Sequence, residues 1–87
     1  MSPGKKGRGG APAGLGDSVR AALERYFHDL DGHEPKDLYE LVLSQVEKPL
    51  MEKIMEHTDG NLSRAAQYLG LNRATLRSRL EKYGLDG

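Results

Sequence analysis

The sequence predicts an all-α fold of four helices in a chain that pairs with a second copy of itself. Apolar residues recur every three or four positions, as they do on one face of a helix. Asn and Gly stand where helices need to start and end. One apolar stripe is too wide to be covered within 87 residues, and a helical core of about 70 residues is marginal by itself. The chain is therefore expected to form one domain that dimerises.

Residues 1–16 are predicted to form a flexible basic arm. They are rich in Gly, include Lys5, Lys6 and Arg8, and carry no acid. The segment has too few bulky apolar side chains to offset its ordering entropy. An inert tail and a non-specific phosphate contact are both open interpretations.

A first helix is predicted over residues 17–30, with Asp17 or Ser18 as its N-cap. Gly32 is expected to stop it. Its spacing forms a single apolar stripe of Val19, Leu23, Tyr26, Phe27 and Leu30.

A second helix is predicted over residues 36–57, with Pro35 in its first turn. Pro49 removes one backbone hydrogen bond, which predicts a kink, or alternatively two helices broken near residues 46–48. The helix is apolar most of the way round, so it must be buried from several sides, and a second copy of the chain is the expected cover. Its apolar residues are Leu38, Tyr39, Leu41, Val42, Leu43, Val46, Leu50, Met51, Ile54 and Met55.

Two short helices joined by a tight turn are predicted between Leu62 and Glu81. Asn61 and Asn72 are their expected N-caps, and Gly70 and Gly84 their expected ends. Small side chains allow the two helices to cross closely, which is the pattern of a helix-turn-helix. The expected inward residues are Leu62, Ala65, Ala66, Leu69, Leu76, Leu80 and Tyr83.

The outward face of the second short helix is basic and hydroxyl-rich, as a phosphate-lined groove requires. Arg suits bidentate contact with guanine, and Thr can reach a phosphate or a thymine methyl. Taken alone, the face also fits an ordinary solvated helix, but the capped helix pair favours DNA binding. The residues left to face outward are Arg73, Thr75, Arg77, Ser78, Arg79 and Lys82.

Charge is segregated along the chain although the net charge is zero. The segments 1–16, 17–57 and 58–87 carry +3, −5 and +2. An acidic middle repels DNA and a basic end attracts it, which would orient the molecule. We assign these segments to the arm, the dimerisation helices and the helix-turn-helix unit.

Other function classes find little support in the sequence. There is no Cys, no apolar run of about 18 residues and no signal peptide pattern, so a cytoplasmic protein is expected, with no membrane partner. His28, His33 and His57 share no metal-ligand spacing. No catalytic Ser/His/Asp arrangement or phosphate-binding Gly loop is visible, so we expect no enzyme, metal or cofactor.

Several motifs together resemble one known family. They are DLYELVL, VE-x-PL, GN-x-x-RAA, GLNR-x-TLR and the closing KYG, within residues 15–86. This stretch resembles Fis, the bacterial factor for inversion stimulation. The C-terminal part alone is also similar to the DNA-binding end of sigma-54-dependent activators.

The resemblance implies an all-helical homodimer whose first two helices interlock and whose last two bind DNA. The two recognition helices would lie closer together than one turn of B-DNA, about 34 Å, so the duplex must bend. It also implies reading of DNA through its shape. The function implied is a nucleoid-associated regulator that activates ribosomal RNA and other promoters, with RNA polymerase or recombinases as possible partners.

Site residues follow from the resemblance position by position. Phosphate contacts at the start of the third helix fall on Asn61, Ser63 and Arg64. The recognition-helix set falls on Asn72, Arg73, Thr75, Arg77, Ser78, Arg79 and Lys82. Within it, Arg73 is expected to contact guanine and Asn72 to read base edges or shape. Phosphates would be held by Thr75, Arg77, Arg79 and Lys82.

The chain differs from the family's pattern at three places, and each difference changes what the resemblance implies about function. The front of the chain lacks the strand pattern of the family's β-hairpin arm, which argues against stimulation of DNA inversion. Asp59 and Ser78 stand where basic residues are usual, so flanking DNA should be wrapped less and one cation per chain is lost. The basic arm is a candidate for partial compensation.

Two alternative functions stay open from the sequence. One is an operator-specific transcription factor similar to the sigma-54 activator ends. The other is a helical interaction module without DNA binding, which the zero net charge and Asp59 keep in consideration.

Overall fold

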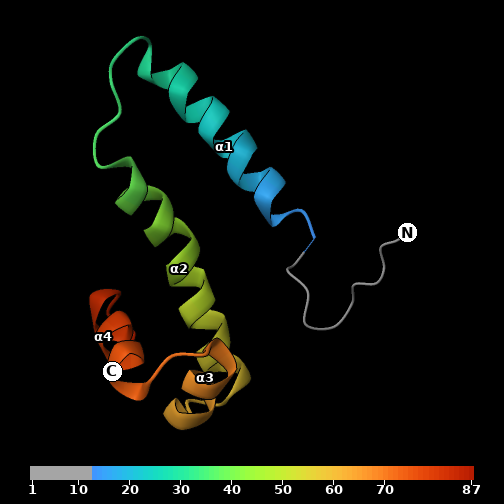
Figure 1. Ribbon diagram of the computed structural model, residues 1–87, viewed down its shortest axis with the longest axis vertical. Helices are drawn as coiled ribbons and strands as arrows, with labels where there is room; N and C mark the ends of the chain where they lie inside the picture. Colours follow the sequence, from blue (N-terminus) through green and yellow to red (C-terminus); the bar gives the residue numbers. More distant parts are fainter. Residues whose placement is uncertain (1–12) are drawn as a thin grey trace. The chain divides into compact units, whose positions relative to one another are not determined.

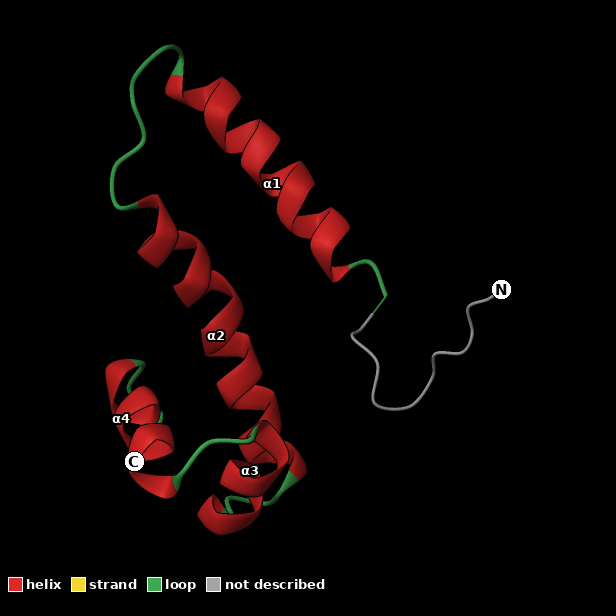
Figure 2. Cartoon of the chain, viewed as in Figure 1, coloured by secondary structure: helices red, strands yellow, loops and turns green. Residues whose placement is uncertain are grey.

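The structure is a computed structural model that describes residues 13–87. The described residues form four α-helices and no strand, which confirms the predicted all-α class (Figure 1 and Figure 2). Most of the predicted basic arm, residues 1–12, lies outside the described range. In chain order the helices are α1 (Leu15–Leu30), α2 (Leu38–His57), α3 (Leu62–Leu69) and α4 (Arg73–Lys82).

The chain divides into two compact units, Met1–Lys36 and Asp37–Gly87. The first contains α1, and the second contains α2, α3 and α4. The second unit carries the predicted site residues of the helix-turn-helix, from Asn61 to Lys82.

The start of α1 differs from the prediction. The helix begins at Leu15, and Gly14 is its N-cap with a φ of 84° and no side-chain cap bond. Neither Asp17 nor Ser18 caps the helix, because both already lie within its first turn, where the Ser18 N–H donates to the Gly14 carbonyl at 2.9 Å. Asp17 instead pairs with Arg20 at 2.5 Å, and its charge suits the positive end of the helix dipole.

The end of α1 agrees with the sequence. The helix ends at Leu30, and Asp31 and Gly32 follow with φ values of 52° and 88°, which an α-helix does not contain. The predicted stripe is half-buried at most, and α1 has no fully buried residue. Phe27, in that stripe, is 47% exposed.

Helix α2 begins later than predicted, at Leu38, so Pro35 precedes the helix and does not lie in its first turn. The reason is Asp37, whose φ of 52° breaks the helical path just before Leu38. From there the helix is continuous through Pro49, which excludes a break into two helices. Pro49 and Gln45 are both exposed, so water can satisfy the Gln45 carbonyl that receives no bond from the proline.

The core of the second unit lies where α2, α3 and α4 meet. Its buried side chains are Met51, Ala65, Ala66, Leu76 and Leu80. The partly buried residues packed against them are Ile54, Met55, Leu62, Leu69, Tyr83 and Leu85. The predicted inward faces of α3 and α4 are therefore confirmed. The C-terminal half of α2, which the sequence grouped with the dimerisation helices, contributes Met51 to the same core.

The turn between α2 and α3 is fixed by backbone geometry. The buried Thr58 hydroxyl donates to the Ile54 carbonyl at 2.9 Å. Asp59 adopts a left-handed φ of 54°, and the Gly60 N–H donates to the Met55 carbonyl at 2.8 Å. These bonds satisfy carbonyls at the end of α2 and direct the chain into α3.

Truncating Leu76 to Ala should destabilise the fold by about 2–5 kcal/mol, because the fully buried side chain would leave a cavity between the helices. Urea unfolding followed by circular dichroism, at a fixed protein concentration, measures the change. The matched control is Gln67→Ala on the exposed side of α3, which should change stability by less than about 0.5 kcal/mol. Equal effects of the two substitutions would contradict the assignment of the core.

Candidate nucleic-acid interface

Two asparagine caps fix the starts of α3 and α4. The Asn61 side-chain oxygen accepts a hydrogen bond from the Arg64 N–H at 3.0 Å. The Asn72 side-chain oxygen accepts one from the Thr75 N–H at 2.8 Å. Both predicted N-caps are confirmed. Because the oxygens are used in capping, the amide NH₂ groups are what these side chains can offer to a ligand.

Two glycines fix the helix ends on either side of the recognition helix. Gly70 has a φ of 78°, and the Leu71 N–H that follows it donates to the Ala66 carbonyl at 3.0 Å. Gly84 has a φ of 70°, and the Leu85 N–H donates to the Leu80 carbonyl at 2.8 Å. This is the Schellman pattern, which a residue with positive φ makes possible. Both predicted helix ends are confirmed.

The outer face of α4 presents the predicted polar residues. Leu76 and Leu80 are buried on the opposite side, so the helix has one inner and one outer face. Thr75 is half-buried. The remaining members of the predicted set on this helix are exposed, namely Arg73, Arg77, Ser78, Arg79 and Lys82.

The structure joins the start of α3 to the start of α4. The Arg73 guanidinium donates a hydrogen bond to the Ser63 hydroxyl at 3.3 Å, across a sequence separation of 10 residues. Arg64, also at the start of α3, is exposed. The hydrogen bond thus links the two groups of predicted residues, one at the start of each helix.

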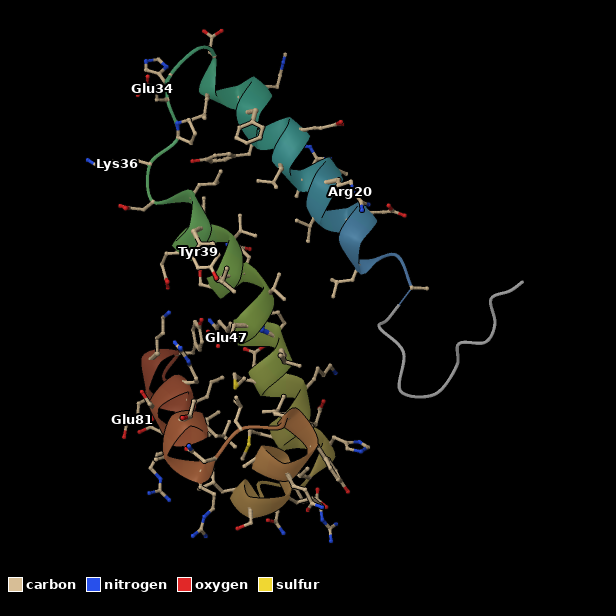
Figure 3. The ribbon with its side chains drawn as sticks, viewed as in Figure 1. Arg20, Glu34, Lys36, Tyr39, Glu47 and Glu81 are labelled. Atoms are coloured by element: carbon tan, nitrogen blue, oxygen red, sulfur yellow. The ribbon has the colours of Figure 1, made fainter. Side chains whose placement is uncertain are left out.

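The C-terminal end of α4 has different surroundings, because carboxylates of α2 contact it (Figure 3). Arg79 Nε lies 3.5 Å from a carboxylate oxygen of Glu47. The Tyr83 hydroxyl donates to the other carboxylate oxygen of Glu47 at 2.6 Å. The ammonium of Lys82 pairs with Glu40.

These two glutamates were missed in the sequence analysis. Glu40 and Glu47 are seven residues apart, which places them two turns apart on one face of α2. That spacing was the available signal, but it does not say which helix the face meets.

The contacts change the acid–base properties of α4. The hydrogen bond to Glu40 raises the pKa of Lys82 above its ordinary value. The hydrogen bond that Tyr83 donates to Glu47 raises the pKa of the phenol, and partial desolvation acts in the same direction. Both groups act as hydrogen-bond donors toward carboxylates of α2.

Metal ligands and membrane-spanning helices are two other features to consider in the described part of the chain. Between residues 13 and 87, no three side chains of His, Cys, Asp or Glu gather in a group that suits a metal ion. None of the helices described in that range is both long and apolar enough to cross a membrane.

Comparison of the sequence with known proteins gives matches to one family. Residues 42–83 match the family described as "Bacterial regulatory protein, Fis family". The DNA-binding protein Fis of Proteus mirabilis is 54% identical over 72 residues, covering 83% of this chain and 74% of that protein. The DNA-binding protein Fis of Escherichia coli is 53% identical over the same length and shares of both chains.

Tyr83 should ionise above the ordinary phenol pKa of 10.0, because Glu47 stabilises the protonated form. Spectrophotometric titration at alkaline pH measures this, with Tyr83→Phe identifying which of the 4 tyrosine transitions is lost. Glu47→Gln should lower the Tyr83 pKa toward the ordinary value. The hydrogen bond contributes fully to the free energy of unfolding at pH values below the Tyr83 pKa of the unfolded chain. This contribution is lost as the pH rises through the higher Tyr83 pKa of the folded chain. An unchanged Tyr83 transition in Glu47→Gln would contradict the contact.

Proposed function

This chain belongs to the Fis family of bacterial regulatory proteins, and from that premise we propose that it is a homodimeric protein that binds and bends double-stranded DNA. In this proposal it acts as a nucleoid-associated transcriptional regulator in the cytoplasm. Relatives that carry the name DNA-binding protein Fis support the proposal. RNA polymerase and site-specific recombinases are the candidate protein partners.

The observation that carries the proposal is the helix-turn-helix with its basic outer face. Caps at Asn61 and Asn72 fix where α3 and α4 start, and Gly70 fixes the turn between them. Such a unit places the N-terminal end of its second helix in the major groove, where base edges are reached. The start of α4 carries Arg73 and, one turn later, Arg77, both exposed.

Each side chain then has a proposed role. Arg73 reads guanine, and its contact with Ser63 supports the extended side chain beside the groove. Asn72 contacts base edges through its amide NH₂. Phosphate contacts are proposed for Asn61, Ser63, Arg64, Thr75, Arg77, Arg79 and Lys82, with Ser78 placed beside them on the outer face.

Exposed apolar side chains support the homodimer. Helix α1 has no fully buried residue. In α2, Tyr39 is 80% exposed and Leu50 is 47% exposed. Side chains of this kind are seldom left in water together along one helix, and a second copy would cover them. We therefore propose that residues 17–57 supply the dimer interface.

Bending follows from the dimer rather than from a single chain. Two α4 helices closer than one turn of B-DNA reach adjacent major grooves only if the duplex curves toward the protein. The free energy of curvature depends on sequence, so the proposed reading of DNA rests largely on shape and flexible steps.

Fluorescence anisotropy on a labelled duplex of about 27 base pairs tests the function. If some eight phosphates are neutralised per dimer, the slope of log affinity against log salt should be about −7. The fitted stoichiometry should be two chains per duplex. A flat slope, or no binding at low salt, would support the interaction-module alternative. Tight binding to one sequence only would support the operator-specific alternative.

Bending is measured on a fragment of about 150 base pairs, which is one persistence length of DNA. Ligase should close this fragment into circles faster in the presence of the protein. Unchanged ring closure under conditions of full binding would remove bending from the proposal and leave DNA binding intact.

Arg73→Ala should weaken binding at a preferred duplex by about 1–3 kcal/mol, because a bidentate contact with guanine is lost. Competition anisotropy against a duplex with that guanine replaced should show that the preference is lost as well. The control is Arg20→Ala, which removes the same charge from the exposed surface of α1. Equal losses for both variants would mean that Arg73 contributes only charge.

A further inference from the structure

The cations of α4 fall into two groups according to their partners. Arg79 and Lys82, near its C-terminal end, each pair with a carboxylate of α2. In the part of the chain that the structure describes, Arg73 and Arg77 form no ion pair. Arg73 has instead the neutral Ser63 hydroxyl as its partner. Ion pairs with α2 are therefore confined to the cations near the C-terminal end of α4 in the described chain.

Glu47 is partly buried and contacts both Tyr83 and Arg79. Its side chain is 21% exposed, and it accepts from Tyr83 at 2.6 Å while it faces Arg79 Nε at 3.5 Å. Figure 3 shows Glu47 on the part of α2 that lies next to α4. A half-buried carboxylate with two donors is less screened by salt than a surface ion pair.

Glu40 acts on the neighbouring cation. It pairs with the Lys82 ammonium, which also lies 5.4 Å from the centre of the Tyr83 ring. The Lys82 side chain is 35% exposed. A lysine ammonium is a single compact charge, so a carboxylate that occupies it competes directly with any phosphate.

We propose that Glu40 and Glu47 limit the affinity of this protein for DNA by competing with DNA phosphates for Lys82 and Arg79. The inference rests on the proposed function. Phosphates are the same at every sequence, so this competition lowers the sequence-independent part of binding. It leaves the base contact of Arg73 untouched. The two glutamates therefore set how strongly the protein holds DNA, and Arg73 sets which DNA it prefers.

The test compares the charge-neutral variants Glu40→Gln and Glu47→Gln with the wild-type chain. Gln keeps the volume of Glu, and its oxygen can still accept from Tyr83. Glu52→Gln is the matched control, because it removes the same charge from the same helix and Glu52 forms no ion pair within the described range. Circular dichroism and thermal melting verify the fold of each variant.

On a duplex without the preferred guanine, each of the two variants should bind roughly two- to fivefold more tightly than Glu52→Gln, the range expected for releasing one exposed or half-exposed ion pair. The salt slope should steepen by about 0.9 for each phosphate newly neutralised. The ratio of affinities for the preferred and non-preferred duplexes should stay unchanged. Weaker binding, a changed ratio or an effect no larger than that of Glu52→Gln would overturn the proposal.

A double-mutant cycle tests whether the gain in DNA affinity of Glu40→Gln depends on Lys82, the cation that Glu40 pairs with. Lys82→Ala should lower the affinity for DNA only slightly in the wild-type chain. In the Glu40→Gln variant it should abolish the gain in affinity. Arg77→Ala should cost the same in both backgrounds. Glu40 is 58% exposed and has only Lys82 as a partner in the described chain. The cycle on Glu40 and Lys82 therefore tests the proposal even if Glu47→Gln disturbs the fold. Additivity of Glu40→Gln and Lys82→Ala would overturn the proposal.

The outcome is separable from failure of the proposed function. A wild-type chain that shows no salt-dependent binding to any duplex removes both proposals. A wild-type chain that binds DNA, with Gln variants equal to the control, removes only the competition and leaves DNA binding in place.

Discussion

The packing of Met51 against α3 and α4 is the constraint on which the described C-terminal unit depends. Met51 and Leu76 are its largest fully buried side chains, and they come from the first and last helices of the unit. The same core contains Ala65 and Ala66, whose small side chains allow the helices to approach closely. The recognition helix is therefore held by α2 as well as by its partner in the helix-turn-helix.

Charge adds a second connection between the same two helices. Glu40 and Glu47 on α2 contact Lys82 and Arg79 on α4 and Tyr83, which caps the end of α4. Within the described chain, Arg73 and Arg77 are the cations of α4 that form no ion pair. Two acids of the middle segment thus neutralise part of the basic segment. Opposite charges thus serve both the internal packing and the presentation of the remaining cations.

The apolar surface of α2 gives the same helix a third role. Its C-terminal half packs in the core of one chain, while Tyr39 and Leu50 stay exposed in that chain. A helix that is apolar on several sides needs several partners. In the proposed dimer, α2 would pack with the second copy and with its own helix-turn-helix at once. The spacing of the two recognition helices would then be determined by α2, and with it the curvature of the DNA.

The sequence by itself determined the local features of this protein, because a cap or a turn depends on neighbouring residues. Asn61, Asn72 and Gly70 act where the sequence places them, and the inward faces of α3 and α4 follow from spacing alone. The predicted starts of α1 and α2 were each wrong by two residues. The glycine cap of α1 and the positive φ of Asp37 leave no trace in the spacing of apolar residues, which was the basis of the prediction. Only the tertiary structure decided that Lys82 and Tyr83 meet carboxylates 42 and 36 residues earlier in the chain. Such contacts depend on how one helix packs on another, and that angle is set by the whole core rather than by any local stretch.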